Sequence, residues 1–318
     1  MKLTITDRNK YIKKCDVSQL PIEYSNTKKV ELFGKQIELF DDPWMWHLHL
    51  KCTDVCNANC RFCVEKVHRN DIGNSEHFLE NTDRMLTEME NNGILFSVSV
   101  TGGEPLLFNR FDKLVDILKM HKIKFLTINT NGTLLESKLS KLDGVFNVLD
   151  ISRHGFSDAE NNEIFCTTVP TINELQQLRN RLEKTKMRIQ CVAERLNSVE
   201  DMLKFIDVYK FADDISIRRL MKLGEEYDQN YVINDDIYTE FLDFAFKNWE
   251  FKEQTIQDYY VYEIYNTGKK DITFSYSNMD MLREVEKLES DNFIREFIIH
   301  PNGCVSGSWG MDNKILLT

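Results

Sequence analysis

The residues in this sequence best suited to chemistry are three cysteines on one short segment. Cys56, Cys60 and Cys63 follow a C-x3-C-x2-C spacing directly after a predicted strand. A disulfide framework would spread its cysteines more evenly along a smaller chain. Three thiolates on one loop can bind a single iron–sulfur cluster. A four-iron cluster held by three cysteines keeps one iron open, and an open iron is what a chemical role requires.

A structural zinc site is the alternative interpretation of these cysteines. Structural zinc takes four ligands, so Cys52 or His68 would have to supply the fourth. Cys52 lies inside the predicted strand, where we expect it to be a small core residue. A non-catalytic iron–sulfur or zinc-binding protein therefore stays open as a different class of function.

Glycines and polar residues stand at the ends of the next two predicted strands. The segment T-G-G-E-P ends one of them, and there Gly102 and Gly103 permit close approach of the backbone to a ligand. The carboxylate of Glu104 is suited to hold an ammonium group. Asn131 ends the following strand in a T-N-G segment, and Asn129 shares its face of the strand. An ordinary turn is the alternative for both glycine-containing segments.

The cysteine segment T-D-x-C-N-x-x-C-x-F-C resembles the cluster loop of the radical S-adenosylmethionine (SAM) superfamily. It is most similar to the branch that contains the GTP-cyclising enzyme of molybdenum cofactor synthesis, and the resemblance covers about residues 46–224. It implies that Cys56, Cys60 and Cys63 bind a [4Fe-4S] cluster whose open iron takes the amino and carboxylate groups of SAM. Phe62 stands where the family places an aromatic residue whose backbone approaches the SAM adenine.

The resemblance extends to the strand-end motifs. The family's G-G-E-P binds the SAM amino group, its T-N-G lies near the methionine or ribose, and a serine after the fourth strand contacts SAM. In the family an arginine of the sixth strand often contacts SAM too. Arg218 lies two residues after Ser216 and so projects from the same face of the strand, and we therefore expect it to point inward. The implied cofactor-binding residues are Phe62, Gly102, Gly103, Glu104, Asn129, Asn131, Ser152 and Arg218.

This chain departs from the family after Ser152. Relatives usually continue with Leu-Asp, whereas this sequence has Arg153 and His154. A histidine can donate, accept or shuttle a proton near neutral pH. We therefore expect Arg153 and His154 to read the substrate as catalytic residues, with a surface-loop histidine as the alternative.

The activity implied by the resemblance begins with reductive cleavage of SAM. One electron from the cluster gives methionine and a 5′-deoxyadenosyl radical, which abstracts hydrogen from an unactivated C–H bond. We expect a small polar metabolite as the substrate and flavodoxin or ferredoxin as the reductant. The oxidoreductase, lyase and isomerase subtypes stay open. The alternative is a maturase of a ribosomally made peptide, with residues 1–44 binding the leader.

A second cluster is not expected, because Cys304 is the only cysteine after residue 224. The predicted cofactors are therefore one [4Fe-4S] cluster and SAM. Without an auxiliary cluster to accept a product electron, redox-neutral or SAM-regenerating chemistry is favoured.

The elements that must position these residues are alternating strands and helices. Six predicted strands imply parallel β/α units, which fit a doubly wound sheet or an incomplete barrel. Polar residues at alternate strand positions favour a barrel interior wide enough for a ligand, with a buried hydrogen-bond network as the alternative. We predict an α/β fold with a partial (β/α)6 barrel of the radical SAM type. The predicted strands are 45–53, 94–101, 123–130, 145–152, 187–193 and 215–220.

Additions flank the predicted barrel, which spans residues 45–224. Residues 1–44 form an N-terminal extension with a possible hairpin at 30–40. Residues 225–318 form a C-terminal region, mainly helical over 236–292, with a terminal hairpin at 293–308. That hairpin either covers the barrel mouth or is a structural end of the chain.

Composition narrows the possible partners and location. The formal net charge of -11 disfavours nucleic acid as a partner. The sequence contains no run of 18 apolar residues, so we predict no membrane span. The first residues lack an apolar secretory core, so we expect a cytoplasmic protein.

Overall fold

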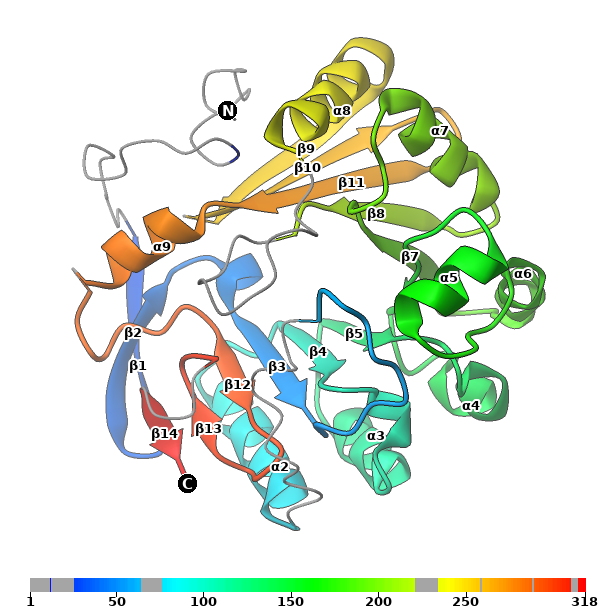
Figure 1. The fold of residues 1–318 in the computed structure, drawn as a ribbon. Coiled ribbons are helices and arrows are strands. Elements are labelled where there is room, and N and C mark those ends of the chain that lie inside the picture. Colours follow the sequence, from blue (N-terminus) through cyan, green and yellow to red (C-terminus); the bar gives the residue numbers. More distant parts are fainter. Residues whose placement is uncertain are drawn as a thin grey trace.

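A curved sheet with helices along its outer side forms the body of the protein (Figure 1). The computed structural model describes residues 12, 26–63, 76–220, 234–257, 259–287, 289–309 and 314–318. Within these residues a 12-stranded sheet has the order β14-β13-β12-β3-β4-β5-β6-β7-β8-β11-β10-β9. A separate sheet pairs β1 with β2.

Six parallel strands form the centre of the large sheet and confirm the predicted partial (β/α)6 barrel. Each pairs with the next strand in sequence, so right-handed crossovers place the connecting helices on one side. A doubly wound sheet would reverse its strand order. The strands are His47–Lys51 (β3), Ser97–Thr101 (β4), Phe125–Thr130 (β5), Val148–Ser152 (β6), Lys186–Val192 (β7) and Asp214–Arg218 (β8). The helices among them are Glu76–Asn91 (α2), Phe111–Met120 (α3), Leu135–Leu142 (α4), Asp158–Phe165 (α5), Ile172–Arg181 (α6) and Val199–Val208 (α7).

The two faces of the parallel strands differ in chemistry. Leu48, Val98 and Ile128 are fully buried and belong to the core cluster that the outer helices share. On the other face, strand pairing aligns Ser99 with His49 on one side and with Thr127 on the other. The predicted polar inner face is therefore confirmed.

Helix α5 was not predicted, although its start carries a clear capping signal. Ser157 and Glu160 form a capping box, and Cys166 ends the helix in a left-handed conformation with φ 52°. The helix has 8 residues and a weak apolar stripe, so hydrophobic periodicity does not reveal it. The predicted caps at Thr171 and Ser198 are confirmed at the starts of α6 and α7.

The expectation of a mainly helical segment over 236–292 is wrong for residues 250–277. Helices Asp235–Asn248 (α8) and Met279–Glu286 (α9) enclose three strands, Glu250–Gln257 (β9), Tyr260–Asn266 (β10) and Asp271–Ser277 (β11). Aromatic and β-branched residues alternate through β10 and β11, which favours strands over helix. Strand β11 pairs in parallel with β8, so these strands extend the barrel wall.

The predicted terminal hairpin is confirmed and lies at the opposite edge of the sheet. Strands Phe297–Ile299 (β12) and Val305–Ser306 (β13) are antiparallel, and Ile315–Leu317 (β14) pairs with β13. Strand β12 pairs in parallel with β3, so the hairpin continues the wall of the barrel. Trp309, beyond β13, lies against His49 with ring centroids 4.7 Å apart.

The predicted N-terminal hairpin is also confirmed, as Thr27–Leu32 (β1) and Lys35–Phe40 (β2). Its apolar side chains, including Leu32 and Leu39, belong to the main core cluster. The backbone of Glu38 bonds to Asn292 and Ile294 at 2.9 and 2.8 Å. The hairpin therefore packs onto the barrel.

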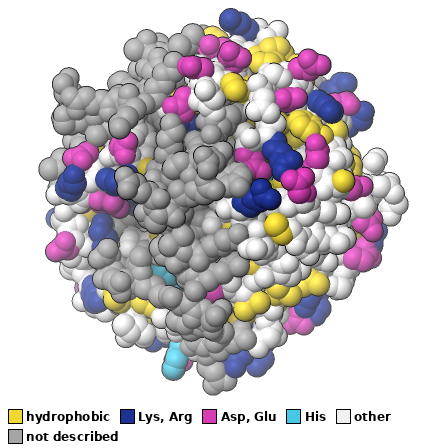
Figure 2. All heavy atoms as spheres, in the orientation of Figure 1, with side chains coloured by type: hydrophobic (Ala, Val, Ile, Leu, Met, Phe, Trp, Pro, Cys, Tyr) yellow, Lys and Arg dark blue, Asp and Glu magenta, His cyan; other side chains and the backbone are white. Residues whose placement is uncertain are grey.

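Charges of both signs are mixed on one face of the molecule (Figure 2). On the face shown in Figure 2, basic and acidic side chains of the described residues are interspersed. No helix in the described ranges is both long enough and apolar enough to cross a membrane.

Candidate active site

The cysteine loop leaves the carboxyl end of β3, the end of a barrel at which active sites are built. Cys56, Cys60 and Cys63 are partly buried on this loop. Cys56 and Cys60 pack against a small apolar cluster of Ala58, Phe165 and Val169. The loop therefore packs against the end of α5, which includes Phe165.

The two glycines after β4 contact the cysteine loop itself. Gly103 N donates to Thr53 O at 2.7 Å, and Glu104 N donates to Val55 O at 2.8 Å. A Cβ atom at Gly102 would lie 2.3 Å from Thr53 O, and one at Gly103 would lie 2.3 Å from Val55 O. The sequence predicted close approach to a ligand, whereas the closest approach seen is to the loop backbone.

Glu104 is almost fully buried, and it joins the ends of β4 and β5. Its Oε1 accepts hydrogen bonds from Thr130 Oγ1 at 2.6 Å and from Leu106 N at 3.1 Å. Its Oε2 accepts one from Asn131 N at 2.7 Å. Burial raises the pKa of this carboxyl group, and the hydrogen bonds oppose that effect. These contacts fix the turn beneath the cysteine loop.

Asn131 connects its turn to the cysteine loop through Asn57. Asn131 Nδ2 donates to Asn57 Oδ1 at 2.8 Å, and Asn57 Nδ2 donates to Thr133 Oγ1 at 2.9 Å. Asn57 was not predicted as a functional residue, although it stands between the first two cysteines of the motif. The loop is thus tied to both β4 and β5.

Arg153 is fully buried, and its guanidinium group is engaged with the backbone. It donates to the carbonyl oxygens of Asn131, Ser152 and Pro170 at 3.0, 2.5 and 2.9 Å. With no exposed atom left, the side chain holds the T-N-G turn in place. This geometry does not support the expectation that Arg153 reads the substrate.

His154 is buried as well and is neutral at physiological pH. Burial, with the nearby Arg153 charge, lowers its pKa to about 3. Val192 N donates to His154 Nδ1 at 2.9 Å, which leaves the proton on Nε2. Its ring stacks on Phe165 with centroids 5.3 Å apart and lies perpendicular to the ring of Phe62 with centroids 4.9 Å apart. His154 therefore positions Phe62, and this environment does not support proton shuttling near neutral pH.

Asn129, Ser152 and Arg218 all lie partly buried on the inner face. Strand pairing places Asn129 opposite Asp150 and Ser152 opposite Gln190. Arg219 points the other way, because it donates to Ile12 O and pairs with Asp235. The expectation that Arg218 points inward is confirmed.

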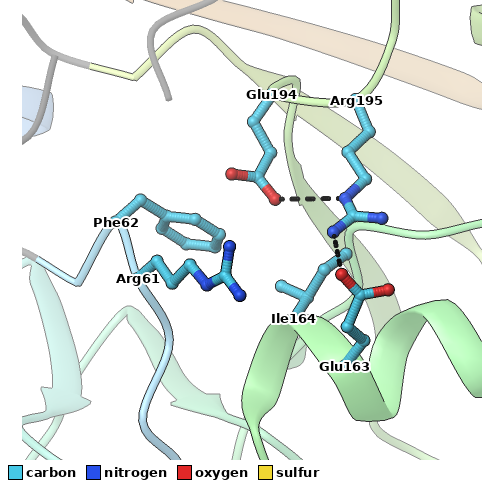
Figure 3. Close-up of a pocket in the computed structure, with 6 residues that line it drawn as sticks. All are labelled: Arg61, Phe62, Glu163, Ile164, Glu194 and Arg195. Carbon is cyan, nitrogen blue, oxygen red and sulfur yellow. Dashed lines mark hydrogen bonds and ion pairs between the residues drawn. The ribbon is translucent and has the colours of Figure 1, made fainter. Parts of the chain in front are cut away.

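A pocket of about 180 Å³ opens beside Phe62 (Figure 3). Glu194, just beyond β7, reaches into it with a side chain only 5% exposed. One carboxylate oxygen lies 3.7 Å from Arg195 Nε, and the buried Oε2 accepts no hydrogen bond within the described chain. Burial raises the pKa of Glu194. Sequence reasoning missed this residue, whose one signal was its place after the fifth predicted strand.

The donor set of the loop fits an iron–sulfur cluster. No three His, Cys, Asp or Glu side chains of the described ranges converge on one metal ion. A four-iron cluster does not need such convergence, because each cysteine binds its own iron. Cys52, by contrast, is a buried core residue as expected. His68, the other zinc ligand considered, lies outside the described residues.

The partial barrel and the three-cysteine loop at its strand ends define a barrel enzyme built for an iron–sulfur cofactor. The sequence matches the Radical SAM superfamily over residues 50–223. The chain belongs to that superfamily, and an iron–sulfur cluster and SAM are the cofactors that its membership implies.

Curated relatives confirm the predicted branch. A GTP 3′,8-cyclase of Clostridium perfringens is 30% identical over 211 residues, which cover 64% of this chain and 62% of the relative. A probable GTP 3′,8-cyclase of Methanocaldococcus jannaschii is 24% identical over 190 residues, which cover 58% and 57%. The match spans about three-fifths of each relative's length.

Solved structures support the fold. SuiB of Streptococcus suis bound to its precursor peptide SuiA superposes with a TM-score of 0.57 at 18% identity, covering 82% of this chain and 59% of SuiB. SuiB bound to SAM gives a TM-score of 0.53, covering 83% and 58%.

Proposed function

We propose that this enzyme binds a single [4Fe-4S] cluster through Cys56, Cys60 and Cys63 and cleaves SAM reductively to act on a small polar metabolite. The observation that carries the proposal is the cysteine loop, held by backbone bonds against the G-G-E turn at the strand ends. When bound, the cluster supplies the electron that breaks the C–S bond of SAM, and the resulting 5′-deoxyadenosyl radical abstracts a hydrogen atom.

The protein's own part is to bind and orient SAM. In this proposal Phe62 offers its backbone and ring edge to the adenine, and Glu194 Oε2 accepts a hydrogen bond from the adenine amino group or a ribose hydroxyl. Glu194 is suited to this because a buried carboxylate oxygen without a partner is costly until a donor arrives. Glu104, Asn129, Asn131 and Ser152 surround the methionine part, with Glu104 also fixing the turn.

The inner face of the barrel favours a polar substrate. His49 Nδ1 bonds to Ser99 Oγ at 2.9 Å, and its Nε2 bonds to Glu296 at 2.8 Å. Arg188 lies 3.4 Å from Asp150 on the same face. A surface of this kind stabilises hydroxyl, amine and carboxylate groups better than hydrocarbon. We further propose flavodoxin or ferredoxin as the reductant, and redox-neutral or SAM-regenerating chemistry after hydrogen abstraction.

A peptide substrate is a second candidate, favoured by one observation. Strand β1 has β2 as its sole strand neighbour within the described residues, so its outer edge has no strand partner there, although Asn92 Nδ2 donates to Glu31 O on that edge at 3.0 Å.

The decisive experiment is the detection of 5′-deoxyadenosine. The protein is reconstituted with iron and sulfide without oxygen, reduced and given SAM, and the nucleoside is measured by chromatography. Wild type is expected to produce it, and Cys60→Ala is expected to lose both the product and most of the bound iron. Cys166→Ala removes an exposed cysteine outside the loop and should behave as wild type. A wild-type protein that neither binds SAM nor forms the nucleoside would contradict the proposal.

A further inference from the structure

Arg218, the last residue of β8, is a cation on the inner face of the barrel that has no bonding partner among the described residues. It makes no hydrogen bond or ion pair with any residue that the structure describes, and its Nε is buried and unbonded. The phenol of Tyr260, followed by Tyr262 and Asp150, raises the pKa of Arg218 against the opposing effect of burial. The guanidinium is therefore charged and has donors to offer.

Three hydroxyl groups that have no hydrogen-bond partner in the described part of the chain share the inner face with Arg218. Ser275, Ser277 and Tyr260 are 1%, 3% and 6% exposed, and the hydroxyl oxygen of each is buried and unbonded within the described ranges. Buried hydroxyls in native proteins are nearly always bonded, so these three are candidates for contact with a ligand.

The strand register brings these groups together. Arg218 pairs with Ser275 on β11, and Ser277 pairs with Tyr260 on β10. Ser275 and Ser277 are two residues apart and therefore project from the same face of β11. Arg218 and Ser277 end parallel strands, so the group lies at the carboxyl end of the barrel, as the cysteine loop does.

The opposite face of these strands is closed by packing. Phe274 and Tyr276 are fully buried and contact Tyr238 of α8, whose hydroxyl bonds to the carbonyl oxygens of Ile217 and Ser275 at 2.9 Å. The side chains of Arg218 and its hydroxyl neighbours therefore face the interior of the barrel.

Two carboxylates on this face of the central strands each lie near a cation other than Arg218. Asp150 is the nearest acidic influence on Arg218, and it lies 3.4 Å from Arg188. Asp214, the first residue of β8, has a carboxylate oxygen 3.8 Å from Lys186 Nζ. Because these two carboxylates each have another cationic neighbour, neither forms an ion pair with Arg218, whose charge can interact with a ligand.

We propose that Arg218, Tyr260, Ser275 and Ser277 form a subsite for an oxyanion of the substrate, a carboxylate or a phosphate. An arginine fork and hydroxyl donors suit either group. The proposal rests on the proposed function and replaces the expectation that Arg218 contacts SAM. Three strands, β5, β6 and β7, separate β8 from β4 and its G-G-E turn, so the subsite lies away from the SAM amino-acid end. Strands β10 and β11 lie beyond the family match at residues 50–223, so the hydroxyls come from outside the matched part of the chain.

The test is calorimetric titration of the reconstituted protein with inorganic phosphate and, separately, with succinate, in chloride buffer of constant ionic strength. Arg218→Met should weaken binding of the preferred anion about tenfold or more. Tyr260→Phe should weaken it about threefold, without loss of charge. Arg181→Met removes an exposed arginine that pairs with Glu136 and should bind as wild type. Arg218→Lys controls for a folding defect in Arg218→Met. It keeps the positive charge and should bind the anion with intermediate affinity.

Binding of phosphate alone or of succinate alone identifies the substrate group, and either result supports the subsite. Equal affinity in wild type and Arg218→Met, or no binding by wild type, overturns it. Each titration is repeated with saturating SAM. If saturating SAM abolishes anion binding and Arg218→Met binds SAM more weakly, the subsite binds SAM itself. That result would also overturn the proposal. If the protein forms no 5′-deoxyadenosine but still binds the anion through Arg218, the proposed function is contradicted and the subsite is still supported.

Discussion

At the scale of single residues, the inner surface combines groups that are already engaged with groups that still lack a partner. Glu104 belongs to the first kind, because backbone and hydroxyl donors use both of its carboxylate oxygens, and the two terminal nitrogens of Arg153 are likewise bonded to carbonyl oxygens. Within the described residues, the Oε2 atom of Glu194 and the Nε atom of Arg218 belong to the second kind. A ligand gains most from the second kind, since binding satisfies atoms that folding left unpaired.

Glu194 gives a prediction for SAM affinity and its pH dependence. Glu194→Gln should weaken SAM binding about threefold to tenfold, the effect of one hydrogen bond. Because burial raises the Glu194 pKa, the wild-type carboxylate takes up a proton as pH falls and loses its power to accept. SAM affinity should therefore decline towards acid pH in wild type, measured by equilibrium dialysis.

The matched control is Glu163→Gln, which lines the same pocket but pairs with Arg195 at 2.9 Å. This variant should keep the acid decline, whereas Glu194→Gln should lose it. An unchanged pH profile in Glu194→Gln would remove Glu194 from the SAM site.

At the scale of elements, helix α5 is a support for the cysteine loop. Its last residue, Phe165, accepts a hydrogen bond from Asn59 N at 2.8 Å and belongs to the apolar cluster under Cys56 and Cys60. Weakening α5 should therefore loosen the loop that binds the cluster.

Two capping boxes allow this support to be tested. Ser157→Ala at the start of α5 and Thr171→Ala at the start of α6 each remove the same kind of cap, which costs about 1 kcal/mol of stability. We expect similar losses of thermal stability but faster cluster loss in Ser157→Ala alone, followed by the decay of visible absorbance under a chelator. Equal decay in both variants would show that α5 does not support the loop.

The sequence predicted the elements with strong periodicity and missed those without it. The six barrel strands and the caps of α6 and α7 appear within a few residues of their predicted positions. Strands β9 to β11 were expected as helix because their acidic residues obscured the alternation of aromatic side chains. For the site, the cysteines and glycines are recognisable from local spacing. The roles of Arg153 and Glu194 are not, because they depend on which distant backbone atoms lie within reach.

At the scale of the whole molecule, buried neutral histidine makes stability depend on pH. The pKa of His154 is about 3 in the folded protein and near 6.5 when the chain is unfolded. Below pH 6.5 the unfolded chain therefore binds a proton that the folded protein does not. This contribution to stability is complete above pH 6.5 and is lost as pH falls towards 3, at up to roughly 1.4 kcal/mol per pH unit.

We therefore expect His154→Gln to narrow the difference in unfolding free energy between pH 7 and pH 5. The narrowing should be about 2 kcal/mol relative to wild type, measured by anaerobic urea unfolding. His77→Gln, at an exposed position on α2, should leave the difference unchanged. An equal pH response in wild type and His154→Gln would contradict the buried, neutral state of His154.

The backbone contacts between the G-G-E turn and the cysteine loop also allow local opening of the loop to be measured by hydrogen–deuterium exchange. The amide hydrogens of Gly103 and Glu104 bond to loop carbonyl oxygens and can exchange with solvent deuterium only when the loop detaches. Their protection against exchange thus measures the free energy of detaching the loop while the rest of the barrel stays folded.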